Sequence, residues 1–255
     1  MLCYEQLIKL RNQLSFFSPS TDLPAKLPVR VDTSLEKFAF PSSVIAQPVQ
    51  VLAASIFLVV VPVFFQAPLV RSLPWLSLTL TGTWLMAGIS LISRSNSKLW
   101  GDLLIGFTWT WLAGSIYWGW FRWEPFIHLP IEALGIPIVL GLLIRGRGRV
   151  GSYFYLGSLL GTAVTDLYVY WVDLLPLWRQ VMVVDPDWAP VLLREAAIAL
   201  QNPVAFSRGL LLAVGLLTVG LIPLKSKQPC WWAFSGAVLS TLIVDLLFLT
   251  SAFLV

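Results

Sequence analysis

Residues 51–70, VLAASIFLVVVPVFFQAPLV, contain no charged side chain over 20 positions. A bilayer core of about 30 Å is crossed by about 20 helical residues, so this stretch is long enough to span a membrane. Pro62 lies inside it, and a membrane helix tolerates proline when neighbouring groups satisfy the freed carbonyl. The stretch therefore predicts a transmembrane helix.

Further apolar stretches follow along the chain, separated by polar loops. The composition agrees with a membrane protein, because 57% of the residues are hydrophobic and only 12% are charged. Soluble domains carry about 25% charged residues, and this chain has too little polar material for a solvated surface. We predict an all-α, polytopic transmembrane helix bundle of about seven spanning helices, near residues 51–70, 73–92, 99–121, 129–144, 152–172, 204–224 and 231–253.

The stretch 129–144 is the shortest of these, with 16 residues, and it contains Glu132 and Pro137. A re-entrant or tilted segment is the alternative to a full span. The basic loop that follows, 145–151, favours the full span because it then lies on the same side as the other basic loops.

An N-terminal extension, residues 1–47, is more polar than the transmembrane domain, residues 48–255. Apolar residues from Tyr4 to Leu14 recur in it at helical spacing. This pattern predicts a short amphipathic helix, which could lie on the membrane surface or pack on the protein itself.

Basic residues indicate the orientation in the membrane. Twelve of the seventeen Lys and Arg residues lie in the N-terminal extension and in loops 93–98, 145–151 and 225–230. The positive-inside rule then predicts a cytoplasmic N-terminus and a lumenal or periplasmic C-terminus. Since these loops account for the net charge of +4, we expect membrane lipids and other membrane protein subunits as partners, and no nucleic acid.

Two aspartates lie within predicted spans. GSLLGTAVTDL (157–167) aligns without gaps with GAVLSTLIVDL (236–246), through either an internal repeat or chance similarity. Charged groups at this depth usually face the protein interior or water. Facing each other, the two carboxylates could share a proton or bind a cation; alternatively, each is held by a backbone group or a threonine hydroxyl. This candidate intramembrane polar site comprises Asp166, Asp245, Thr162 and Thr241.

A second candidate site lies at the outer face and comprises Arg122, Glu124, His128 and Glu132. On a continuous helix the last three would align, and histidine with two carboxylates can bind a metal. Pro125 and Pro130 interrupt the segment, which favours helix capping with Glu132 as a first-turn acid. We therefore predict no metal site, expect Arg122 to pair with Glu124, and keep a substrate or proton role for His128 as the alternative.

Tryptophans crowd one region, with five of them between Trp109 and Trp123. Indoles prefer the membrane interface, so an aromatic belt is the expected reading. The alternative is a stacking platform for a planar pigment or quinone. No nucleotide-binding loop, paired-histidine metal motif or serine nucleophile elbow occurs. The sequence thus favours a protein that is not an enzyme, and it identifies no catalytic residue and no cofactor.

Three long segments, Leu99–Pro125, Tyr155–Tyr168 and Trp231–Thr241, together resemble an uncharacterised family of cyanobacterial integral membrane proteins, classed as a domain of unknown function. The resemblance covers roughly residues 45–250. It implies a thylakoid or plasma membrane, and it supplies no activity, substrate or site residues.

The sequence leaves three functions open. The first is an accessory, assembly or interaction factor in a cyanobacterial membrane, which the resemblance and the lack of a catalytic motif favour. The second is a proton- or cation-coupled transporter that uses Asp166 and Asp245. The third is a membrane enzyme that acts on lipid, quinone or pigment through His128 and Glu132.

Overall fold

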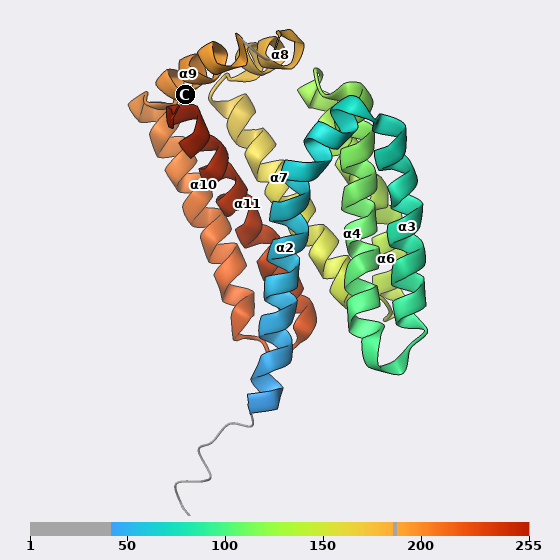
Figure 1. Ribbon diagram of the computed structural model, residues 1–255. Coiled ribbons are helices and arrows are strands. Elements are labelled where there is room, and N and C mark those ends of the chain that lie inside the picture. Colours follow the sequence, from blue (N-terminus) through green and yellow to red (C-terminus); the bar gives the residue numbers. More distant parts are fainter. Residues whose placement is uncertain (1–41, 186–187, 255) are drawn as a thin grey trace, which may run out of the picture. The chain divides into compact units, whose positions relative to one another are not determined.

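The computed structural model describes residues 42–185 and 188–254, which belong to one compact unit of the chain, Pro41–Val255. All regular elements of these residues are helical, which confirms the predicted all-α class for them (Figure 1). Most of the predicted N-terminal extension, with its amphipathic helix, lies outside the described residues, whereas residues 42–47 already belong to the first described helix.

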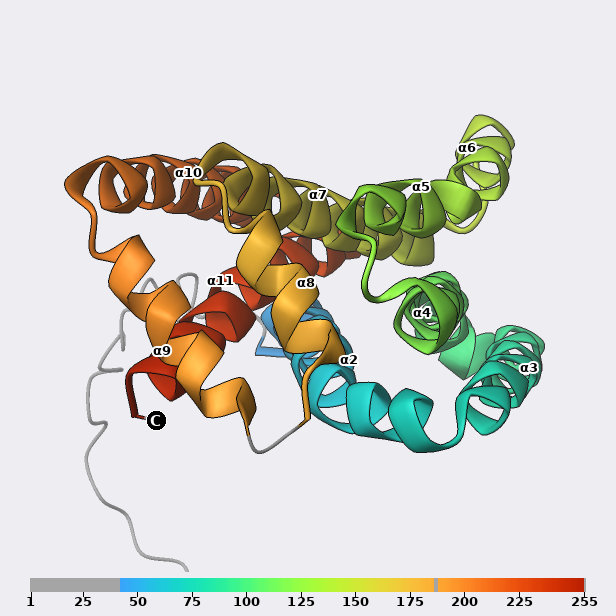
Figure 2. The ribbon, with the colours of Figure 1, turned by 90° about the horizontal axis from the view of Figure 1, so that it is seen from above.

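Long helices run alongside one another through the described unit (Figure 1). They are α2 (Ser42–Ser72), α3 (Pro74–Ile92), α4 (Lys98–Ile116), α7 (Arg149–Trp171), α10 (Pro203–Leu221) and α11 (Pro229–Leu254). Short elements complete the fold: η3 (Ser95–Ser97), η4 (Tyr117–Phe121), η5 (Pro125–Ile127), α5 (His128–Glu132), η6 (Ala133–Gly135), α6 (Ile136–Ile144), α8 (Leu175–Val183), α9 (Ala189–Leu200) and η8 (Ile222–Lys225). Seen from above, α8 and α9 lie across one end of the long helices (Figure 2).

Five segments of the described chain are long and apolar enough to cross a membrane, judged by length and composition. They are Gln47–Ser72, Pro74–Ile92, Pro125–Ile144, Pro203–Lys225 and Pro229–Ser251. The short predicted span 129–144 begins earlier than expected, at Pro125, and reaches 20 residues. The predicted spans 99–121 and 152–172 correspond to α4 with η4 and to α7, which are not among the five.

Packing explains why α4 and α7 are less apolar than the other long helices. α4 packs against α3 and α7, and α7 also packs against α6, α10 and α11. A helix covered by other helices needs few lipid-facing side chains, and small residues let the backbones approach closely. The buried small residues include Gly101, Gly106, Gly114 and Ser115 on α4 and Gly151, Ser152, Gly157 and Gly161 on α7.

The apolar core lies where α2, α4, α7 and α11 meet. Its buried residues are Val51, Leu103, Phe107, Trp111, Phe154, Ala233 and Ala237. The outside of the long helices is also apolar, with strongly exposed side chains such as Phe65, Met86 and Leu211. A surface of this kind suits contact with lipid better than contact with water.

A buried polar network joins α2, α3 and α4, and nothing in the sequence pattern singled it out. Gln66 Nε2 donates to the Trp111 carbonyl oxygen at 2.8 Å and to Ser115 Oγ at 3.0 Å. Ser115 Oγ is 2.8 Å from Ser77 Oγ, and the Trp111 indole donates to the Ser77 carbonyl oxygen at 2.9 Å. Interhelical hydrogen bonds of this kind hold membrane helices together.

Replacing Gln66 by leucine is expected to lower the free energy of unfolding by about 1 kcal/mol, because both interhelical hydrogen bonds of its amide are lost. The midpoint of thermal unfolding in detergent should fall by about 2–4 °C. Thr79→Ala is the matched control, since the Thr79 hydroxyl donates only within its own helix, to the Leu76 carbonyl oxygen. Equal midpoints for the two variants would contradict the network's role.

Candidate functional site

His128, the only histidine of the chain, lies between two carboxylates. Its Nδ1 is 3.0 Å from Asp166 Oδ1, a hydrogen-bond distance, and its Nε2 is 3.9 Å from Glu132 Oε1. The three side chains are 16%, 12% and 9% exposed for His128, Asp166 and Glu132, so all are largely shielded from solvent. Each ring nitrogen therefore faces a carboxylate, and the one at Nδ1 is within hydrogen-bond distance. These three residues are called the His128 cluster below.

The histidine stands on an interrupted helix. α5 (His128–Glu132) is little more than one turn, and 3-10 segments precede and follow it before α6 continues. Pro125 and Pro130 lack the amide hydrogen that a regular helix would use, which accounts for the irregular start. His128 and Glu132 are four residues apart and share one face of the turn. Of the three residues that the spacing would align on a continuous helix, only His128 and Glu132 share a helical turn, and Glu124 does not.

α7 fixes the interrupted helix through three side chains. Asp166 binds the His128 imidazole, as described above. The Tyr155 hydroxyl donates to the Glu132 carbonyl oxygen at 2.5 Å, and the Tyr170 hydroxyl donates to the Pro125 carbonyl oxygen at 2.8 Å. Residues 155, 166 and 170 lie on one face of α7, because their spacings of 11 and 4 are close to three turns and one turn of a helix. α7 thereby sets the position of His128 relative to Asp166.

η4, a π-helical segment that continues α4, supplies an aromatic wall. The fully buried Tyr117 ring stacks on the His128 imidazole, with centroids 4.0 Å apart and planes at 23°. The Trp118 ring meets the imidazole edge-on at 6.4 Å. π-helical turns within α-helices occur frequently at functional sites. Here the π-helical turn follows α4, and two successive rings of this turn, Tyr117 and Trp118, cover the histidine.

One carboxylate oxygen of Asp166 lacks a hydrogen-bond partner in the described part of the chain. Its Oδ2 is buried and makes no hydrogen bond within the described residues. Buried polar atoms are rarely left in this state, so the oxygen is available to a proton or to a donor from outside the chain. With His128 protonated and both carboxylates ionised, the His128 cluster carries a charge of minus one. A further proton on either carboxylate makes it neutral, so two of its states differ by a single proton.

The structure places the two predicted aspartates in different surroundings. Asp166 binds His128, whereas Asp245 Oδ2 accepts a hydrogen bond from Thr165 Oγ1 at 3.0 Å. Thr241 lies against Gly161, where an added Cβ would be within 3.0 Å of the Thr241 Cβ. Thr162 is half-buried on α7. The predicted intramembrane group therefore contributes one residue, Asp166, to the His128 cluster.

The outer-face residues divide as well. Glu124 pairs with Arg179 of α8, with 3.1 Å between Oε1 and Nη2. Arg122 instead donates through Nη1 to the Trp118 carbonyl oxygen at 3.4 Å. The expected pair of Arg122 with Glu124 is thus wrong, because η5 turns the chain after Glu124 and leaves this carboxylate beside α8. Only His128 and Glu132 of this group join Asp166.

Three residues of the site were missed from the sequence: Tyr117, Tyr155 and Tyr170. The spacing of Tyr155 and Tyr170 relative to Asp166 was a usable signal, since it places all three on one helical face. No comparable signal pointed to Tyr117. Within the described residues, no group of three or more His, Cys, Asp and Glu side chains is placed to hold a metal ion. The side chains of the His128 cluster can gain, lose and transfer a proton.

Residues 55–253 match the family described as "Protein of unknown function (DUF3120)". This match confirms the resemblance to a family of unknown function and covers every residue of the His128 cluster. No match was found among curated proteins or among solved structures.

Proposed function

We propose that the protein moves protons across a membrane. The chain belongs to the DUF3120 family, whose description states no activity, so the proposal is argued from the residues alone. One observation carries the proposal. A shielded histidine touches a carboxylate at Nδ1, faces a second carboxylate at Nε2, and stands on an interrupted helix. Ionisable groups within membrane domains commonly form proton relays, and broken helices form binding sites in transporters.

The proposed topology has seven spans. Five are the apolar segments named above, and α4 with η4 and α7 are the other two, because surrounding helices cover them. The distribution of basic loops supports a cytoplasmic N-terminus and a lumenal or periplasmic C-terminus. The family resemblance of the sequence supports a cyanobacterial thylakoid or plasma membrane. In this topology the His128 cluster lies in the outer half of the membrane.

The proton transfer has a direct order in the proposal. A proton from the outer side binds Asp166 Oδ2, which has no other partner among the described residues. The Asp166 carboxyl group then turns so that the protonated oxygen faces Nδ1. A neutral His128 with its hydrogen on Nε2 takes up this proton at Nδ1 and becomes an imidazolium, which gives its Nε2 proton to Glu132. The 3.9 Å separation of Nε2 and Glu132 is bridged by a water molecule or by a small rotation of α5. Each transfer changes the charges on His128 and the two carboxylates, and so changes the electrostatic attraction between α5 and α7. This change favours a movement of the interrupted helix.

Two other functions remain as candidates. An accessory role in a membrane complex is supported by α9 and its start, where Trp188 and Ile198 expose 65% and 60% of their surface at the end of the bundle. An enzymatic role on lipid, quinone or pigment through His128 has less support, because Tyr117 and Trp118 cover the imidazole. The transporter proposal keeps Asp166 from the sequence interpretation and replaces Asp245 by His128 and Glu132.

Proton flux into liposomes tests this function. Purified protein is reconstituted into liposomes that contain a pH-sensitive dye, and a potassium gradient with valinomycin sets the membrane potential. The rate of proton entry into liposomes with wild-type protein should exceed the rate into protein-free liposomes. Asp166→Asn should lower the rate at least about tenfold, because the relay loses a group that exchanges a proton. Asp245→Asn is the matched control, a carboxylate outside the His128 cluster, and should transport like wild type.

Each contrary outcome has a clear meaning. Flux equal to that of protein-free liposomes at both signs of the potential contradicts proton translocation. Equal flux in Asp166→Asn and wild type contradicts the role of the His128 cluster. Both variants replace a carboxylate by an amide of the same size, and size-exclusion profiles in detergent check that both remain folded.

A further inference from the structure

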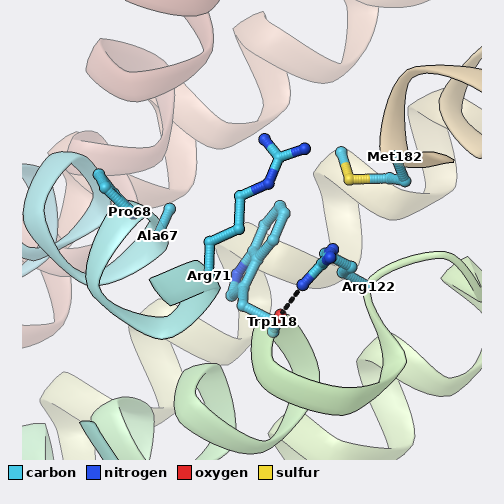
Figure 3. A pocket seen from close by; sticks show the side chains of 6 residues that line it. All are labelled: Ala67, Pro68, Arg71, Trp118, Arg122 and Met182. Carbon is cyan, nitrogen blue, oxygen red and sulfur yellow. Dashed lines mark hydrogen bonds between the residues drawn. The ribbon is translucent and has the colours of Figure 1, made fainter. Parts of the chain in front are cut away.

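A cavity of about 280 Å³ opens beside the aromatic wall, at the end of the bundle where α2 finishes. It is lined by Ala67, Pro68, Arg71, Trp118, Arg122 and Met182 (Figure 3). Arg71 is in the last turn of α2, Arg122 directly follows η4, and Met182 belongs to α8. Three elements that are distant in sequence therefore enclose it.

Neither arginine of the cavity, Arg71 or Arg122, forms an ion pair within residues 42–185 and 188–254. Arg122 Nε is buried and lacks a hydrogen-bond partner there, and the Nη1 bond to the Trp118 carbonyl oxygen is long, at 3.4 Å. Figure 3 shows both arginine side chains beside the Trp118 ring. The cavity thus presents two guanidinium groups with donors that have no partner among the described residues.

Neighbouring Arg179 differs in this respect, because it pairs with Glu124 at 3.1 Å. A guanidinium offers a planar fork of donors that matches phosphate and carboxylate oxygens. The donors of Arg71 and Arg122 that lack a partner in the described part of the chain therefore point to an anion.

The surroundings indicate what carries the anion. Trp123 lies under the Arg122 guanidinium at 5.8 Å, and Trp75 packs edge-on against Trp120 at 5.2 Å. Indoles gather at the level of lipid headgroups. The remaining walls, from Ala67, Pro68 and Met182, are apolar. An anion joined to an apolar chain can contact both the arginines and the apolar walls. A small soluble anion contacts the arginines alone.

We propose that this cavity binds the anionic headgroup of a membrane lipid, with its phosphate between Arg71 and Arg122 and its apolar part along the α2 and α8 walls. The site is separate from the His128 cluster, although Trp118 borders both. It stands whether or not the protein moves protons.

Native mass spectrometry of the detergent-purified full chain tests this site, with phosphatidylglycerol and phosphatidylcholine as probes. Wild-type protein should retain phosphatidylglycerol in preference to phosphatidylcholine. The double variant Arg71→Gln/Arg122→Gln should bind phosphatidylglycerol at least about tenfold more weakly, because both charge-assisted contacts are lost. Arg145→Gln/Arg147→Gln is the matched control, since it removes the same charge from an exposed loop between α6 and α7 and should bind like wild type.

A third variant and a competitor separate the remaining explanations. Ala67→Leu keeps both charges, narrows the cavity, and should also weaken phosphatidylglycerol binding. Unchanged binding in the arginine variant or in Ala67→Leu, or an equal loss in the control pair, would overturn the site. Inorganic phosphate should fail to displace the lipid at equal concentration; displacement would overturn the lipid assignment in favour of a soluble anion.

Discussion

Gly106→Ala is expected to destabilise the protein by about 3 kcal/mol or more, which is at the upper end of the cost of overpacking. A Cβ at Gly106 would lie 2.1 Å from the carbonyl oxygen of Gly151, and a Cβ at Gly151 would lie 2.1 Å from the carbonyl oxygen of Asp102. These obstacles are backbone atoms and cannot rotate away. The added methyl group therefore has to push α4 and α7 apart along their crossing.

Gly82→Ala is the matched control for this prediction. It makes the same substitution within α3, where an added Cβ meets nothing within 4 Å. Alanine is favoured over glycine in a helix by about 1 kcal/mol, so this variant should be as stable as wild type or slightly more stable. Denaturation in mixed detergent micelles measures both variants. If both variants changed the free energy of unfolding in the same direction, the close contact of α4 with α7 would be contradicted.

His128→Leu is expected to cost about 3–5 kcal/mol, because it leaves two buried carboxylates without their cationic partner. Asp166 would lose its hydrogen bond at Oδ1 while Oδ2 already lacks one among the described residues. The double variant His128→Leu/Asp166→Leu should recover most of the lost stability, since apolar pairs can replace buried ion pairs at little cost. Unfolding of the single and double variants in the same detergent measures this coupling.

The outcome that would contradict this prediction is additivity. If His128→Leu and Asp166→Leu each lower stability and the double variant loses the sum, the two side chains do not act as a pair. Asp245→Leu combined with His128→Leu serves as control, because Asp245 is bound to Thr165 rather than to the cluster. That combination should be additive.

The long apolar segments could be predicted from the sequence because apolar length is a local property of the chain. Five predicted spans correspond to segments that are long and apolar enough to cross a membrane. α4 and α7 carry more small and polar residues, because other helices cover them. Their apolar content alone therefore does not settle whether they span.

The partner of Asp166 could not be predicted, and helix register explains why. The sequence alignment pairs Asp166 with Asp245, at a separation of 79 positions. α7 and α11 instead pack with a separation of 80, which brings together Gly157 with Ala237, Gly161 with Thr241, and Thr165 with Asp245. One residue is a rotation of about 100° on a helix. Asp166 therefore points away from α11 and toward His128.

The sequence predicted the interruption of this helix but not the direction in which its side chains point. Pro125 and Pro130 indicated that Glu124, His128 and Glu132 cannot share a regular helix, and Glu124 indeed pairs elsewhere. The prolines also led to the expectation of capping, with Glu132 as a first-turn acid. The structure keeps His128 and Glu132 on one turn and aims both at α7, a tertiary arrangement that depends on Tyr155 and Tyr170.

The π-helical segment η4 also limits how this chain can change in length. A π turn accommodates one residue more than the α-helix around it, so deleting Gly119 would restore regular winding and leave a continuous helix. The deletion would rotate everything after it by about 100° relative to Tyr117. His128 and Arg122 both follow the deletion, so Tyr117 would lose its stacking on the histidine and Arg122 would leave the cavity. A change of one codon could thus disturb both sites without breaking the helix that connects them.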